Sequence, residues 1–158
     1  MKWIAGLFAA TVGFAGPAIA EDYDLGALRA SAEKYKDVKV ALAEGYIPDP
    51  SGHCVSAELE GLPAEWGSMG IHYLRPDLLK ITSSPGERVD GQSTHTDFMA
   101  PAILLYEPQA DGSLELVGVE NLVFEVAWMA GGHHGAPMMN GRQWEHMADD
   151  QNTPGDEA

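Results

Sequence analysis

The sequence predicts an α+β protein in which an N-terminal amphipathic helix packs on a small antiparallel β-sheet. Three observations lead to this prediction. Apolar residues recur at helical spacing early in the chain, they alternate with period two from residue 67, and a turn-rich segment later separates two apolar runs. The chain has 158 residues. Because compact domains usually have about 100–200 residues, we expect one domain over residues 21–148.

The charge of the chain excludes some classes of partner. It has 24 acidic and 9 basic side chains, with a formal net charge of -15. Nucleic-acid phosphates and anionic membrane surfaces repel such a chain, so we expect it to bind neither. A metal ion or a small molecule remains the expected partner, and the oligomeric state stays open.

Residues 1–20 have the pattern of a cleaved secretory signal peptide. Lys2 gives a positive start, an uncharged and mostly apolar stretch runs to Phe14, and a small-x-small cleavage pattern precedes Glu21. A membrane anchor is the alternative, but the apolar stretch is shorter than the roughly 20 residues of a spanning helix, and Gly16–Pro17 interrupts its end. We therefore expect a periplasmic or secreted protein.

The first mature element is predicted to be one amphipathic helix from about Asp24 to Glu44. Asp22 or Asp24 can cap its start, and Gly45 ends it. Residues 46–52 contain prolines and glycine, so we expect a connecting loop. The apolar stripe of the helix consists of Leu25, Leu28, Ala32, Tyr35, Val38 and Leu42. A stripe with this spacing indicates core packing rather than a ligand site.

Period-two alternation then predicts a strand over residues 67–74. Its odd positions from Met69 to Tyr73 lie on one face, and Arg75–Pro76 ends it. Residues 80–97 are rich in Ser, Thr, Gly and Asp, which predicts a long exposed loop, with a short helical turn just after the proline.

A β-hairpin is the best-supported unit of the sequence. Residues 102–106 form an apolar run typical of a buried strand, and residues 107–112 have the composition of a turn. Residues 114–128 return as one long strand or as two strands bent at 118–121.

Regular patterns fade beyond Trp128. Residues 129–141 are rich in glycine without a helical or strand period, and residues 144–147 favour a helical turn. Residues 149–158 are acidic and polar, so we expect a disordered tail.

Histidine and methionine side chains cluster after the first third of the chain. Thioether and thiolate ligands favour Cu(I), and imidazole binds copper or zinc. We therefore predict a non-enzymatic copper- or zinc-binding protein. The candidate ligands are His72, His133, His134, Met138, Met139 and His146.

Each of these side chains can also be present without binding a metal. A histidine pair in a loop often binds nothing, and Met138–Met139 can simply cover the sheet. His72 lies in a strand, where a core or edge role is common. If it is a ligand, Glu107 or Glu120 can accept a hydrogen bond from its second ring nitrogen, and His72→Ala should weaken metal affinity at least tenfold.

Two other function classes stay open. A binding module without metal would use the hairpin and Trp128 as an apolar pocket for a small molecule or a partner. A metal-dependent hydrolase is less favoured. The sequence contains no G-x-S-x-G, H-E-x-x-H or C-x-x-C-H motif and no phosphate-binding glycine loop.

Cys54 is the single cysteine of the chain. Structural cysteines of exported proteins normally occur in pairs, so a missing partner, an intermolecular bridge or a ligand role are the alternatives. A buried, unreactive side chain is a further, simpler alternative.

Three motifs resemble a family of uncharacterised exported bacterial proteins. They are MGIHYLRP at residues 69–76, PAILLYEP at 101–108 and LVGVE at 116–120, and the EGYIP turn at 44–48 also fits. The resemblance covers most of the mature chain and implies no reaction, cofactor or partner. Family members continue beyond the acidic segment into an aromatic strand with histidines and a second cysteine. The resemblance therefore implies that this chain is shortened and that Cys54 is half of a lost disulfide.

Overall fold

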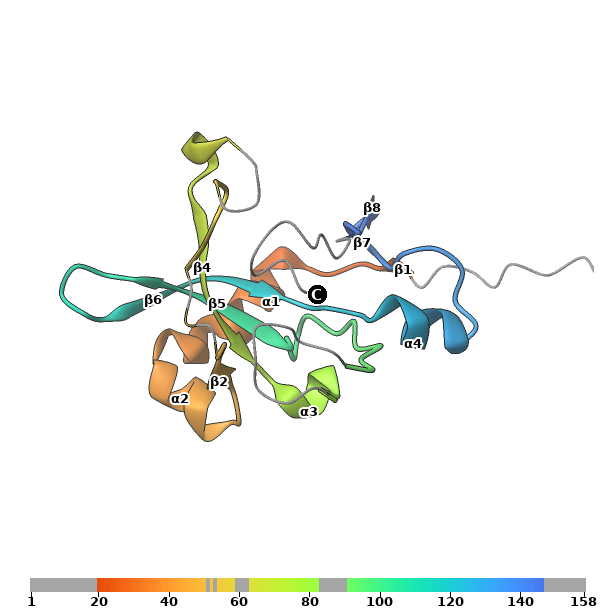
Figure 1. Ribbon diagram of the computed structural model, residues 1–158, viewed down its shortest axis with the longest axis horizontal. Helices are drawn as coiled ribbons and strands as arrows, with labels where there is room; N and C mark the ends of the chain where they lie inside the picture. The colour runs from red at the N-terminus through yellow and green to blue at the C-terminus, as the bar shows by residue number, and fades with distance from the viewer. Residues whose placement is uncertain (1–19, 51, 53, 59–62, 83–90, 147–158) are drawn as a thin grey trace, which may run out of the picture.

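The computed structural model describes residues 20–50, 52, 54–58, 63–82 and 91–146 (Figure 1). It contains helices and an antiparallel β-sheet, so the predicted α+β class is confirmed. The predicted tail, 149–158, and nearly all of the predicted signal peptide lie outside the described residues. The elements in chain order are β1 (Ala20–Glu21), α1 (Leu25–Ala32), the 3₁₀ helix η1 (Glu33–Lys36), α2 (Val38–Ala43), β2 (Ile47–Pro48), β3 (Cys54–Ser56), the 3₁₀ helix η2 (Ala64–Trp66), β4 (Ser68–Leu74), α3 (Pro76–Leu79), β5 (Ile103–Pro108), β6 (Leu114–Glu120), α4 (Glu125–Ala130), β7 (Met138–Met139) and β8 (Arg142–Gln143).

The main sheet has the order β2-β4-β5-β6, and β3 also pairs with β4. All of these neighbours are antiparallel. The long β5–β6 hairpin, predicted from the sequence, crosses the molecule in Figure 1, with its turn at one end and α4 beyond its other end. Because β6 pairs only with β5 among the described strands, it is an edge strand of the sheet.

The helical layer covers one face of this sheet. Tyr35 of η1 and Ala41 of α2 are buried against Leu104 and Tyr106, which are alternate residues of β5. Tyr73 of β4 packs on the same side, with its ring centroid 4.8 Å from that of Tyr106. Strand alternation thus places one set of β4 and β5 side chains under the helices.

The opposite face of the sheet holds a second apolar cluster. Leu74 and Ile103, the neighbours in sequence of Tyr73 and Leu104, pack with Leu79 of α3. The face assignment made for the predicted strand therefore holds at Tyr73 and Leu74. The predicted helical turn after Pro76 is α3.

The single helix predicted from Asp24 to Glu44 is wrong. Its start is correct, because the Asp24 side chain accepts hydrogen bonds from the backbone N–H groups of Gly26 and Ala27. The helix is then interrupted at Asp37, whose backbone is extended with φ -90° and ψ 103°. Asp37 caps α2 by accepting from the backbone N–H of Lys39, 3.0 Å away. An aspartate competes for backbone donors, which favours a new helix start over a helix interior.

Two predicted boundaries shift within the sheet. The loop predicted for residues 46–52 contains β2, because Ile47–Pro48 pairs with the end of β4. The turn predicted from residue 107 is shorter, because Glu107 and Pro108 still belong to β5. The backbone N–H of Gln109 donates to the carbonyl of Ser113 and closes the hairpin.

The loop predicted for residues 80–97 is only partly exposed. Within its described part, Ile81 forms an isolated bridge with Gly91, and Ser93 is fully buried. The carbonyl of Ser93 accepts from the backbone N–H of Phe124, which anchors the loop to the chain after β6.

The strand predicted to reach Trp128 ends at Glu120, and residues 125–130 form α4 instead. A short apolar run does not distinguish a strand from a helix by period alone. The helical turn buries Trp128, and its indole N–H donates to the carbonyl of Gly135 at 2.9 Å.

The segment after α4 is more ordered than predicted. Met138–Met139 pairs with β1 on one side and with Arg142–Gln143 on the other. The helical turn predicted at residues 144–147 is not formed over its described part, 144–146. None of the described helices has the length and apolar character needed to span a membrane.

Candidate functional site

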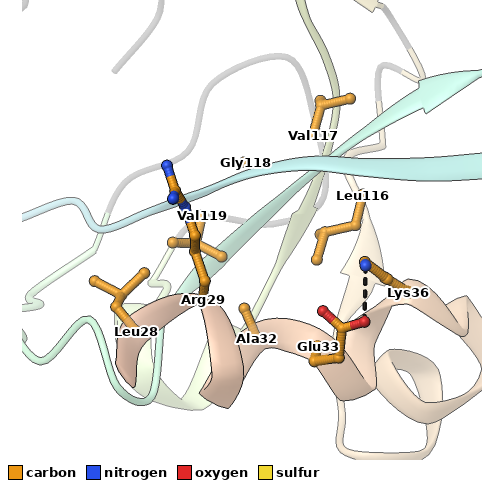
Figure 2. A pocket seen from close by; sticks show the side chains of 9 residues that line it. All are labelled: Leu28, Arg29, Ala32, Glu33, Lys36, Leu116, Val117, Gly118 and Val119. Atoms are coloured by element: carbon orange, nitrogen blue, oxygen red, sulfur yellow. Dashed lines mark hydrogen bonds and ion pairs between the residues drawn. The ribbon is translucent and has the colours of Figure 1, made fainter. Parts of the chain in front are cut away.

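A groove lies between the first helical segment and the edge strand of the sheet, and we call it the α1–β6 groove (Figure 2). Its volume is about 360 Å³. It is lined by Leu28, Arg29 and Ala32 of α1, Glu33 and Lys36 of η1, and Leu116, Val117, Gly118 and Val119 of β6.

The groove exists because the helix lies beside a strand that has no further neighbour among the described residues. Leu116 and Val119 pack against the first core, which is the apolar cluster under the helical layer that contains Tyr35, Leu104 and Tyr106. Ala32 has only a methyl group at the floor of the groove, where a larger side chain would fill the space. Figure 2 shows Leu116 and Val119 directed toward the helix and Val117 on the other side of the strand.

One wall of the groove is charged. Lys36 forms an ion pair with Glu33, with 2.7 Å between Nζ and Oε1. Arg29 is exposed, and no residue in the described part of the chain forms a hydrogen bond or an ion pair with it. Its side chain is directed from α1 toward β6 in Figure 2. The groove therefore combines an apolar floor with one cation that is available to a ligand.

Of the predicted metal ligands, His72 lies on β4, on the sheet face opposite the helices. Its Nε2 is 3.5 Å from Oε2 of Glu120, across the intervening strand β5. Gly118 has no side chain beside Leu105, which leaves room for this approach. Of the two predicted carboxylate partners, Glu120 is therefore the one near His72, while Glu107 is exposed at the end of β5.

This corner of the sheet also contains buried polar atoms that form no hydrogen bond among the described residues. Within the described residues, Oε2 of Glu120 and Nδ2 of Asn121 are buried without a hydrogen bond. The other amide atom of Asn121, Oδ1, accepts from the backbone N–H of Ala102 at 2.7 Å. An ion pair between His72 and Glu120 forms only when the imidazole is protonated.

The remaining predicted ligands follow α4. His133 stacks on the Trp128 ring with 3.8 Å between centroids, and Nε2 of His146 lies 3.2 Å from Oε2 of Glu125. Glu125 and Trp128 are one turn apart on α4, so both histidines lie along the same helix face. His134 is exposed, and Met138–Met139 is half-buried in β7.

The predicted ligands do not form one cluster. In Figure 1, β4 crosses the middle of the hairpin, well away from α4, β7 and β8. Among the described residues, no three His, Cys, Asp or Glu side chains are grouped as a metal site requires. Cys54 is exposed on β3, so its side chain is not the buried one of the simpler alternative, and its neighbour His53 lies outside the described residues.

Sequence reasoning missed the α1–β6 groove. The predicted apolar pocket was assigned to the hairpin and Trp128, but Trp128 is 3% exposed and does not line the groove. The hairpin strand β6 does line it. The other wall comes from a helix about 90 residues earlier, and a lone arginine on a helix gives no signal of its own.

Comparison of the chain with models of known protein families, with curated proteins and with solved structures finds no match. The resemblance to exported bacterial proteins therefore stays a prediction.

Proposed function

We propose that this protein is an exported, non-enzymatic binding protein that holds its ligand in the α1–β6 groove. One observation supports this proposal above the others: the groove has about 360 Å³ of space and joins apolar side chains to Arg29, which has no partner among the described residues. Ligand pockets usually have volumes of about 300–1,000 Å³ and combine apolar walls with a few polar groups. Export rests on the signal-peptide pattern of residues 1–20.

A fluorescent apolar anion tests this proposal directly. We expect 1-anilinonaphthalene-8-sulfonate to bind the purified full chain saturably, because its rings match the floor and its sulfonate matches Arg29. In ¹⁵N-labelled protein, the amide signals of Leu28, Ala32, Leu116 and Val119 should shift most.

The matched controls are Arg29→Gln and Lys39→Gln. Both remove one exposed positive charge, but Lys39 lies on α2 outside the groove. Arg29→Gln should weaken dye binding severalfold and Lys39→Gln should leave it unchanged. Shifts centred on another part of the protein, or equal effects of the two variants, would contradict the proposal.

Copper or zinc binding is a second candidate function, favoured by the arrangement along α4. His133 and His146 contact the same face of this helix, and Met138–Met139 lies between them in sequence. Imidazole and thioether ligands together favour Cu(I). We propose this segment, rather than β4, as the place where a single ion binds.

Metal content by elemental mass spectrometry, followed by chelator competition, tests this second candidate. We expect His133→Ala to weaken metal affinity at least tenfold, because His146 is the only other imidazole proposed for this ion. His72→Ala is the matched histidine variant on β4 and should have little effect. A tenfold loss in His72→Ala alone would instead locate the ion on the strand, as the sequence pattern allows. A protein without metal would exclude both.

A further inference from the structure

We propose that the ligand of the α1–β6 groove is an extended peptide segment of a partner protein, which adds to β6 as a further strand and presents one carboxylate to Arg29. This inference rests on the proposed function and names the class of ligand for the same site. Three features that lie side by side support it: the free edge of β6 among the described strands, the apolar floor of the groove, and the guanidinium of Arg29.

The edge of β6 offers the hydrogen-bonding groups that an added strand needs. β6 spans Leu114–Glu120 and pairs on one side with β5. In the described part of the chain, its other side has no backbone partner. On such an edge about every second residue directs its N–H and C=O outward, so a strand of this length offers roughly three residues to an incoming peptide.

The apolar floor selects the side chains of the incoming strand. Side chains of a strand alternate between the two faces of a sheet. An added strand therefore directs every second side chain toward α1, over Leu28 and Ala32, and the others toward solvent. Leu28 and Ala32 are each only 8% exposed, so they form an apolar floor that is packed on the core beneath it. The matching peptide has apolar residues at alternate positions.

Arg29 selects one carboxylate among these side chains. Its guanidinium has no partner among the described residues, whereas Lys36 is held by Glu33. Guanidinium and carboxylate form paired hydrogen bonds that a single ammonium does not match. Because the chain has a net charge of -15, a run of acids would be repelled on approach. The peptide therefore has one acid at this position and neutral or basic residues elsewhere.

Two other occupants fit less well. The acidic residues 149–158 of this chain contain no apolar side chain larger than proline, so they do not match the floor. In an antiparallel pairing of two copies through β6, Glu115 of one strand would come opposite or diagonal to Glu120 of the other. Like charges on paired strands are destabilising, and two chains of this net charge repel each other.

The test uses a synthetic eight-residue peptide with valine alternating with threonine and with one valine replaced by aspartate. Its fluorescein-labelled form should bind the full chain saturably in an anisotropy titration. Amide hydrogen exchange within residues 114–120 should slow on binding, because outward N–H groups become hydrogen-bonded. A control peptide with N-methylated backbone at every residue has no N–H to donate in either strand direction and should bind at least tenfold more weakly.

Charge exchange tests the role of Arg29. Arg29→Glu should lower the affinity for the aspartate peptide at least tenfold. It should raise the affinity for a peptide with lysine in place of aspartate. Lys39→Glu, the matched reversal outside the groove, should change either affinity less than twofold. Arg29→Gln gives a neutral variant if the reversal disturbs α1, and circular dichroism checks the helix content of each.

Each outcome supports or overturns the inference. Dye binding in the groove without peptide binding, or peptide binding without protection of residues 114–120, overturns strand addition but leaves the proposed function intact. Failure of both dye and peptide overturns both. A dimer detected by light scattering, together with slowed amide exchange of residues 114–120 in the absence of peptide, would show that a second copy occupies the edge. That result would also overturn the inference.

Discussion

Tyrosine hydroxyls connect the helical layer to the rest of the first core. Tyr106 of β5 is fully buried, and its hydroxyl donates to the backbone carbonyl of Tyr35 at 2.6 Å. Tyr46 is buried beside Tyr35, and its hydroxyl donates to the carbonyl of Pro101. Burial raises the pKa of the Tyr46 and Tyr106 hydroxyls well above the usual 10.0. Both groups therefore remain protonated donors over the whole physiological pH range.

Removal of one hydroxyl measures this connection. We expect Tyr106→Phe to lower the free energy of unfolding by about 1–3 kcal/mol, because the buried carbonyl of Tyr35 loses its donor. Urea denaturation gives the value. Tyr73→Phe is the control, since the Tyr73 ring packs on Tyr106 but its hydroxyl bonds to no described residue. Equal losses in the two variants would show that the hydroxyl of Tyr106 has no special role.

Glu44 gives the fold a pH-dependent contribution. Hydrogen bonds from Lys34, and then from the Tyr35 hydroxyl, hold the pKa of Glu44 below its usual 4.5. A carboxyl with a lower pKa in the folded state stabilises the fold above its unfolded pKa. This contribution disappears as the pH falls through the folded pKa.

Glu44→Gln should therefore unfold more easily than the parent chain at a pH of about 7, and the difference should shrink at a pH of about 3. Glu65→Gln is the matched variant, because Glu65 is exposed on η2. It should change stability little at either pH. Chemical denaturation at the two pH values measures both. A deficit in Glu44→Gln that persists undiminished in acid would contradict this assignment.

At the scale of elements, Asp37 decides whether the N-terminal segment is one helix or two. In a helix interior, Asp37→Ala would stabilise by about 0.5 kcal/mol, because alanine is the better helix former. As the cap of α2, the same change should instead destabilise by about 1 kcal/mol. The sign of the change in a thermal or urea melt therefore distinguishes the two. Lys39→Ala, exposed within α2, should alter stability by less than about 0.5 kcal/mol.

The same elements show what a single sequence can predict. An apolar run followed by turn residues located the hairpin correctly. Alternation located β4, and β4 and β5 each bury opposite faces in two different clusters. It failed at residues 121–128, where an apolar run fits both periods and the hydrogen bond from Trp128 to Gly135 favours a helix. The helix break at Asp37 could not be predicted from the apolar spacing either, because the apolar stripe continues on both sides of it. Only the position of the aspartate indicates a cap.

At the scale of the whole molecule, the groove depends on topology more than on any motif. Its walls come from α1 and β6, which have to meet before Arg29 and Leu116 share one surface. A sequence shows which residues are apolar or charged, but not which segments become neighbours. The predicted histidine ligands illustrate the reverse case. Their similar chemistry suggested one site, whereas the fold separates His72 from the residues that follow α4.

Export leads to the last prediction, because the expected cleavage falls inside an element. β1 consists of Ala20–Glu21 and pairs in parallel with β7, with Ala20 opposite Met138 and Glu21 opposite Met139. Cleavage after Ala20 leaves only the second pair and places a new amino group at Glu21. Since β1 has two residues, the loss should cost little stability, and the mature protein should begin at Glu21.

Intact mass spectrometry of the protein recovered outside the cytoplasm measures this directly. We expect the mass of residues 21–158 from cells that express the full sequence. Ala18→Leu, which places a large side chain three residues before the cut, should block processing, because the cleavage enzyme requires small residues at that point and directly before the cut. Ile19→Leu changes the residue between them and should be cleaved normally. Recovery of the full-length mass from the parent sequence would exclude a cleaved signal peptide.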